Sequence, residues 1–133
     1  MPRIVVGLLL LIAAFTVLSL VSGASYLETM LPGGLPLGNA LTATGLCAAA
    51  GSAVGLSARR TALRLVSVAS LVGAAAWLPA SIALAGNLTL NFHGGRSGAW
   101  LALSIVIIAA VLCALGWALA AVLLARYQRA GAA

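Results

Sequence analysis

Apolar residues along this chain fall into four long runs that are separated by short polar or glycine-rich segments. A helix needs about 20 consecutive apolar residues to cross the hydrocarbon core of a bilayer. Each run meets that length, so the pattern predicts four membrane-spanning helices, over residues 4–22, 39–57, 61–86 and 99–125. We therefore expect one all-α transmembrane domain, residues 1–133, in which the four helices form an up-down bundle.

The first run also has features of a secretory signal peptide, because Arg3 precedes it and small residues follow it. Its apolar stretch is longer than the core of about 7–15 residues that signal peptides carry. The other three spans also alternate consistently across a membrane only if the first span is kept. We expect the first run to be a retained helix.

Composition supports lipid as the surroundings of this chain. Hydrophobic residues make up 64% of it and charged residues 6%, whereas soluble domains carry about 25% charged residues. The net charge of +6 comes from arginines that stand singly or in pairs at the ends of the apolar runs. No aromatic-interleaved basic surface accompanies them, so we expect contacts with membrane lipids and no nucleic-acid partner.

The arginines also predict the orientation of the chain. If the four spans alternate, six arginines fall on one side of the membrane, while Arg96 and the only acid, Glu28, fall on the other. Cytoplasmic loops carry the excess of arginine and lysine in membrane proteins. We therefore expect both termini in the cytoplasm and the chain in a bacterial inner membrane. The six arginines are Arg3, Arg59, Arg60, Arg64, Arg126 and Arg129.

The second predicted span is rich in small residues. Cys47, Gly51 and Gly55 recur every four positions and predict a helix-packing face, because small residues let helices approach closely in lipid. The pattern leaves open whether that face packs within the chain or against a partner. We also expect hydroxyls of this span, on Thr42, Thr44 and Ser52, to form hydrogen bonds with neighbouring helices.

Proline and tryptophan mark further positions in the third and fourth spans. Pro79 removes one backbone hydrogen bond and predicts a kink in the third helix. Trp100 falls at the start of the fourth span, where aromatic residues meet the membrane surface. Trp117 falls deeper and needs a hydrogen-bond partner for its N–H group if it is buried.

Residues with catalytic or ligand-binding chemistry are scarce. The chain has one acid, one histidine and no lysine, and no charged residue falls at the centre of a predicted span. Acid–base catalysis, haem ligation and zinc binding each need more such groups, so we expect no enzyme, cofactor or metal site. One candidate polar site remains on the outer side, formed by Glu28, His93 and Arg96; the alternative is a solvated glycine turn.

Two classes of function are consistent with this pattern. The first is a small non-catalytic membrane subunit that packs against a larger complex, such as a respiratory, photosynthetic or transport assembly. The small-residue face and the scarcity of catalytic side chains favour it. The second is a small homo-oligomeric transporter, flippase or channel, with a pathway near Pro79 and the hydroxyls of the second span.

Overall fold

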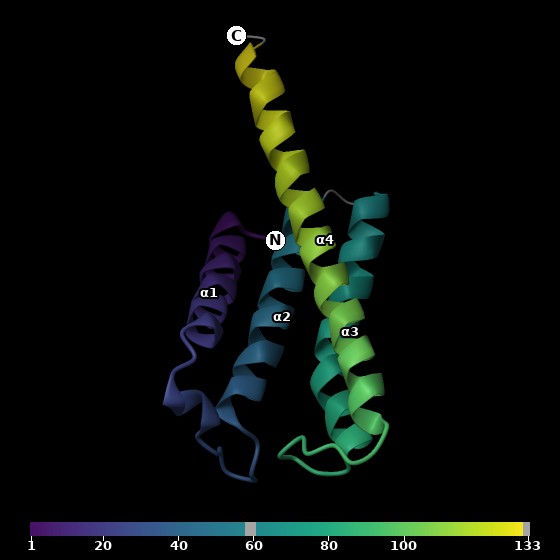
Figure 1. Cartoon of the computed structure of the whole chain (residues 1–133). Coiled ribbons are helices and arrows are strands. Elements are labelled where there is room, and N and C mark those ends of the chain that lie inside the picture. Colours follow the sequence, from purple (N-terminus) through teal and green to yellow (C-terminus); the bar gives the residue numbers. More distant parts are fainter. Residues whose placement is uncertain (58–60, 132–133) are drawn as a thin grey trace.

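The computed structural model describes residues 1–57 and 61–131, and its regular structure is helical (Figure 1). The four predicted helices are confirmed, and each is long and apolar enough to span a membrane. They pack in up-down order, with a short 3-10 helix between the first two. Arg59 and Arg60 lie outside the described residues. The elements are α1 (Arg3–Val21), η1 (Ser25–Glu28), α2 (Leu37–Leu56), α3 (Ala62–Ala85) and α4 (Arg96–Gly131).

Local sequence signals set the helix ends near the corner between α2 and α3. The side chain of Thr61 accepts a hydrogen bond from the backbone N–H of Arg64, which caps the first turn of α3. The Arg64 guanidinium in turn donates to the carbonyl of Val54 in the last turn of α2, at 3.0 Å. A cation at this place also offsets the partial negative charge at the C-terminus of α2. At its other end, α3 is capped by Gly86, whose φ of 72° is one that glycine adopts readily.

α2 is the central helix of the structure. It packs against α1, α3 and α4, and α3 packs against α4. α1 lies along α2 and has no comparable interface with α3 or α4 within the described residues (Figure 1). The architecture is therefore a three-helix unit of α2, α3 and α4, with α1 attached to it through a single neighbour.

Alanine dominates the buried core. The main cluster joins all four helices and contains one large aromatic side chain, that of Trp77, which is 3% exposed. Small side chains allow the helix backbones to approach closely, which is the main source of helix packing in lipid. The other buried members of this cluster are Ala13, Ala48, Ala49, Ala50, Ala74, Ile107 and Val111.

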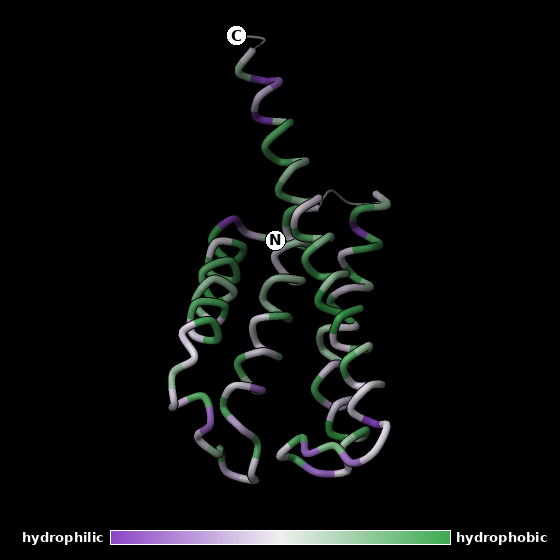
Figure 2. Tube along the Cα trace, in the orientation of Figure 1, coloured by the Kyte–Doolittle hydropathy of each residue, from purple (hydrophilic) through white to green (hydrophobic). Residues whose placement is uncertain are grey.

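α4 extends well beyond the other helices. It has 36 residues, which corresponds to about 54 Å at a rise of 1.5 Å per residue. It runs past the predicted end at residue 125 because the residues that follow, including Arg126, Gln128 and Arg129, are good helix formers. Figure 2 shows that this projecting part turns hydrophilic near its end, while the packed helices are mostly hydrophobic.

The hydroxyls of α2 bond within their own helix, so the prediction of cross-helix bonds from these residues was wrong. Thr42 donates to the carbonyl of Gly38, and Ser52 donates to that of Ala48, each at 2.8 Å. Thr44 likewise donates to the carbonyl four residues before it. A carbonyl at this spacing is always within reach of a serine or threonine in a helix, and it competes with any partner on another helix.

Two tryptophan–serine hydrogen bonds join α3 and α4 instead. The indole N–H of Trp77 donates to Ser104 at 2.9 Å, and that of Trp100 donates to Ser81 at 3.0 Å. Each helix thus supplies one donor and one acceptor. Trp117 is 51% exposed. Because it is not buried, its N–H does not need a hydrogen-bond partner within the chain.

Pro79 lies inside α3, which continues as one helix from Ala62 to Ala85. The residues of the tryptophan–serine bonds, Trp77 and Ser81, stand on either side of it. The kink predicted at this proline stays a prediction.

Candidate functional site

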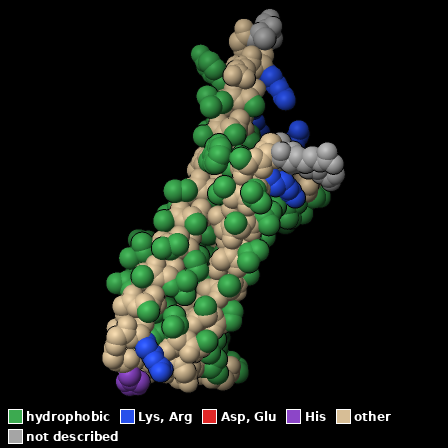
Figure 3. Space-filling model, turned by 90° about the vertical axis from the view of Figure 1, so that its right-hand side faces the viewer, with side chains coloured by type: hydrophobic (Ala, Val, Ile, Leu, Met, Phe, Trp, Pro, Cys, Tyr) green, Lys and Arg blue, Asp and Glu red, His purple; other side chains and the backbone are tan. Residues whose placement is uncertain are grey.

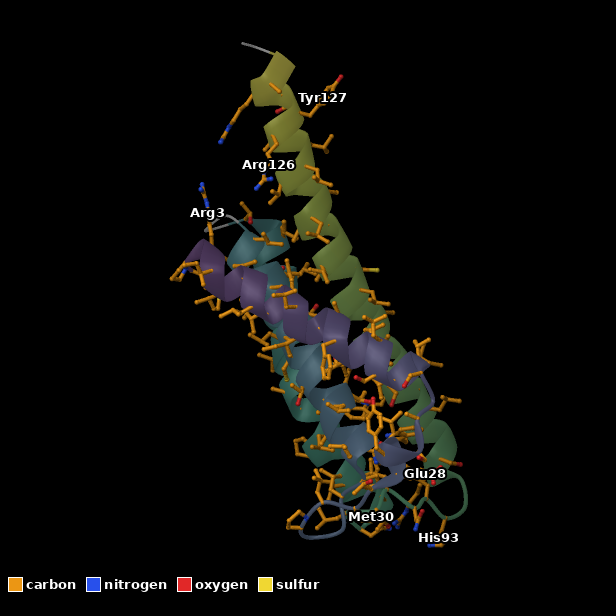
Figure 4. The ribbon with its side chains drawn as sticks, turned by 90° about the vertical axis from the view of Figure 1, so that its left-hand side faces the viewer. Arg3, Glu28, Met30, His93, Arg126 and Tyr127 are labelled. Atoms are coloured by element: carbon orange, nitrogen blue, oxygen red, sulfur yellow. The ribbon has the colours of Figure 1, made fainter. Side chains whose placement is uncertain are left out.

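The predicted outer polar residues lie at one end of the molecule, and the site predicted from them stays a prediction. Glu28 ends η1, His93 lies in the loop between α3 and α4, and Arg96 begins α4. Figure 4 shows Glu28 and His93 at the end opposite to Arg3 and Arg126. All three predicted residues are exposed, and among the described residues no ion pair joins them.

The two loops at this end nevertheless contact each other. A Cβ added at Gly33 would lie 3.7 Å from Leu88, and one added at Gly34 would lie 3.9 Å from Thr89. Gly33 and Gly34 have φ values of +98° and +89°, which glycine adopts readily. The loop between α1 and α2 therefore turns tightly and places its backbone against the loop between α3 and α4.

Asn87 organises the second of these loops. Its side-chain N–H groups donate to the carbonyls of Ala85 and Asn91, at 3.0 and 2.9 Å. Its side-chain oxygen accepts from the Thr89 hydroxyl and from the Asn91 backbone N–H, at 2.8 and 2.9 Å. These bonds enclose Leu90, which is buried and has a φ of +55°. The sequence alone does not predict that Asn87 forms these bonds, because they depend on how the loop folds back on itself.

Replacing Asn87 by alanine is expected to destabilise the protein by about 1–3 kcal/mol, because several loop groups lose their partners. The strained φ of Leu90 then lacks the bonds that hold it. The measurement is denaturant-induced unfolding in detergent micelles, followed by tryptophan fluorescence. Asn39→Ala is the matched control, since the Asn39 side chain makes no hydrogen bond in the described part of the chain. Equal midpoints for the two variants would contradict this role of Asn87.

The predicted small-residue face of α2 is directed toward α1. A Cβ added at Gly51 would lie 3.4 Å from Leu9, and one added at Gly55 would lie 2.6 Å from Val6. A Cβ added at Gly45, which precedes Gly51 on α2, would contact the side chain of Thr16. The glycines of α2 thus provide the close approach on which the α1–α2 interface depends.

Cys47 lies beside this interface rather than inside it. It is half-buried and lines an open groove of about 420 Å³ between α1 and α2. Most of the residues that α2 contributes to the groove are small, and one of them, Thr44, is exposed. The sequence pattern identified Cys47 as a packing residue, but only the structure shows that the chain leaves this flank of α2 partly uncovered, with Thr44 exposed, Cys47 half-buried and Ala48 buried. The groove is lined by Leu9, Ile12, Ala43, Thr44, Cys47 and Ala48.

Charged residues are concentrated at the end where α4 projects. Figure 3 shows arginine side chains near that end and an arginine beside the histidine at the opposite end, with apolar side chains covering the surface between. Arg3, Arg126 and Arg129 line one groove there. Within residues 1–57 and 61–131, no group of three or more histidine, cysteine or acidic side chains is placed to hold a metal ion.

No protein-family model, curated protein or solved structure matches this chain. Three features of the structure stand out: the open groove beside α2, the joined loops at one end, and the arginine groove at the other.

Proposed function

We propose that this chain is a small non-catalytic integral membrane subunit that packs against a larger membrane-protein complex, such as a respiratory, photosynthetic or transport assembly. The observation that carries the proposal is the uncovered groove beside α2, which Ala43, Thr44, Cys47 and Ala48 line. Small residues on a lipid-exposed surface allow the backbone of another helix to approach closely. A helix of a partner protein is the occupant that this surface fits.

The interior of the chain favours a packing role over transport by a single copy. Ser52, Ser67 and Ser81 are completely buried, and each donates its hydroxyl to a carbonyl of its own helix. The surrounding core is largely alanine. Buried hydroxyls that are occupied in this way offer few groups to a passing polar solute. The alternative, a homo-oligomeric transporter, flippase or channel, would place a second copy in the groove.

The proposal includes an orientation. Arg3 begins α1, while Arg126 and Arg129 lie near the end of α4, so these arginines share one end of the up-down arrangement. Arg64, in the first turn of α3, lies at the same end. The excess of arginine on the cytoplasmic side of membrane proteins supports a cytoplasmic location for both termini. The loops that contain Glu28 and His93 would then face outward from a bacterial inner membrane.

The test is native mass spectrometry of the protein extracted from its own membranes in mild detergent, with Thr44→Leu compared to the unchanged chain. Leucine at position 44 fills the groove, and overpacking of this kind costs about 1–3 kcal/mol. We expect a larger membrane-protein chain to be bound at fixed stoichiometry and to dissociate at least about tenfold more readily from Thr44→Leu.

Ala109→Leu is the matched control, because Ala109 is exposed on α4, outside the residues that line the groove. This variant should retain the partner. A bare homo-oligomer that Thr44→Leu disrupts would instead support the alternative, in which copies of this chain pack together. A monomer in every preparation, or equal loss from both variants, would contradict a docking role for the groove.

A further inference from the structure

An open groove of about 480 Å³ lies at the arginine-bearing end, between the first turns of α1, the last turn of α2 and the distal part of α4. Arg3 reaches it from α1, and Arg126 and Arg129 reach it from α4. Figure 4 shows the side chains of Arg3 and Arg126 at this same end of the molecule. Three positive charges from two helices thus meet at one place.

None of these three arginines has an acidic partner within the described part of the chain, and all three are exposed. The only acid, Glu28, lies at the opposite end (Figure 4). Like charges gathered without a counter-charge raise the local positive potential and attract an anion. The planar guanidinium group matches phosphate oxygens through paired hydrogen bonds, so a phosphate is the anion that this cluster suits best.

The remaining walls of the groove are apolar. Val6 and Leu10 line it from α1, Leu56 from α2 and Val122 from α4. A second groove, of about 570 Å³, shares Leu56 and Val122 with it and also reaches Arg129, so the two grooves are adjacent. An inorganic anion would contact the arginines and leave these walls bare, whereas an amphiphile with a phosphate and acyl chains would contact both.

We propose that this groove binds an anionic phospholipid, with its phosphate among Arg3, Arg126 and Arg129 and its acyl chains against the apolar walls. A zwitterionic phospholipid is less suited, because its ammonium group is repelled by the three guanidinium groups. Basic pockets between transmembrane helices on the cytoplasmic side are known to hold anionic headgroups. The binding does not depend on a protein partner, so its test and the test of the groove beside α2 have independent outcomes.

The experiment is native mass spectrometry of the full chain in detergent, titrated with phosphatidylglycerol or with phosphatidylcholine of the same acyl chains. We expect phosphatidylglycerol to bind more tightly. Arg126→Gln should weaken its binding by about fivefold, and the triple glutamine variant of the three arginines by on the order of a hundredfold. Arg96→Gln is the control, since Arg96 begins α4 at the other end of that helix from Arg126 and Arg129, and removing this charge should leave the affinity unchanged.

Gly7→Leu tests the apolar part of the groove. A Cβ at Gly7 meets nothing within 4 Å, so leucine fills the groove without displacing α1 and should also weaken phosphatidylglycerol binding. Gly116→Leu, equally free of clashes but outside the groove, should not. Equal affinities for the two lipids, equal effects of Arg126→Gln and Arg96→Gln, or displacement of the lipid by inorganic phosphate would overturn the proposal.

Discussion

Trp77→Ala is expected to lower the free energy of unfolding by about 3–5 kcal/mol, as large-to-small changes of a buried aromatic do. The indole is 3% exposed and is the largest side chain in a core built mainly of alanine. Alanine neighbours are too short to fill the cavity that remains. The indole N–H of Trp77 also donates a hydrogen bond to the buried hydroxyl of Ser104 at 2.9 Å, and the substitution removes this donor.

The measurement is unfolding of the purified protein in mixed micelles as denaturing detergent is added, with helix content followed by circular dichroism. Trp117→Ala provides the control within the same chain, because Trp117 is 51% exposed and packs mainly against the surroundings. It should change the unfolding free energy by less than about 1 kcal/mol. If Trp77→Ala and Trp117→Ala lowered the free energy of unfolding by the same amount, the core described around Trp77 would be wrong.

A double-mutant cycle separates the hydrogen bond from the packing. Trp77→Phe keeps most of the ring volume and removes the N–H donor, while Ser104→Ala removes the acceptor. Polar contacts between membrane helices are worth about 0.6 kcal/mol on average and up to about 1.7. We expect a coupling free energy in that range between the two substitutions, so most of the effect of Trp77→Ala comes from lost packing.

Gly55→Leu is expected to separate α1 from α2 at the arginine-bearing end and to destabilise the protein by about 1–3 kcal/mol or more. Even a Cβ at this position would lie 2.6 Å from a methyl group of Val6 and 2.9 Å from the sulfur of Met1. The methionine can move aside, but the branched side chain of Val6 is stiff. Within the described residues α1 packs mainly on α2, so no other helix has an extensive interface that would hold it in place once this contact is lost.

The same unfolding measurement, together with hydrogen exchange of the first turns of α1, reports this separation. Gly116→Leu should leave both readouts unchanged, because a Cβ at Gly116 meets nothing within 4 Å. Val6→Ala should partly rescue Gly55→Ala, since it removes the methyl group that the new Cβ would strike. Failure of this rescue, or equal effects of leucine at positions 55 and 116, would count against the close approach of the two helices.

The hydropathy pattern predicted the number and nature of the helices because lipid leaves a spanning segment little other choice. Helix bonding satisfies every backbone group within the segment, so length and apolar composition suffice. The same pattern did not predict how far α4 continues past residue 125, because hydropathy reports immersion in lipid and not helix formation. Helix-forming residues such as Gln128 and Arg129 extend it to Gly131.

It was harder to predict which helices pack against each other, because many alternative helix pairings bury the same small residues. The spacing of Cys47, Gly51 and Gly55 indicated a packing face. Only the structure shows that the two glycines pack against α1, while Cys47 lines a groove beside that interface. The candidate site of Glu28, His93 and Arg96 depended on long-range loop geometry that no local pattern encodes. The loops do meet, through Gly33 and Gly34, yet these three side chains are exposed and no ion pair joins them within the described residues.

The contacts of α2 also describe the order in which the chain can assemble during synthesis. α1 and α2 pack together, α2 packs on α3, and α3 packs on α4, so each new helix finds its sequence neighbour already inserted. Among the extensive interfaces of the described residues, the pairing of α2 with α4 is the one that joins helices that are not consecutive. In a chain that is synthesised from its N-terminus, most of these helix pairings can therefore form as each helix emerges, without waiting for a distant segment.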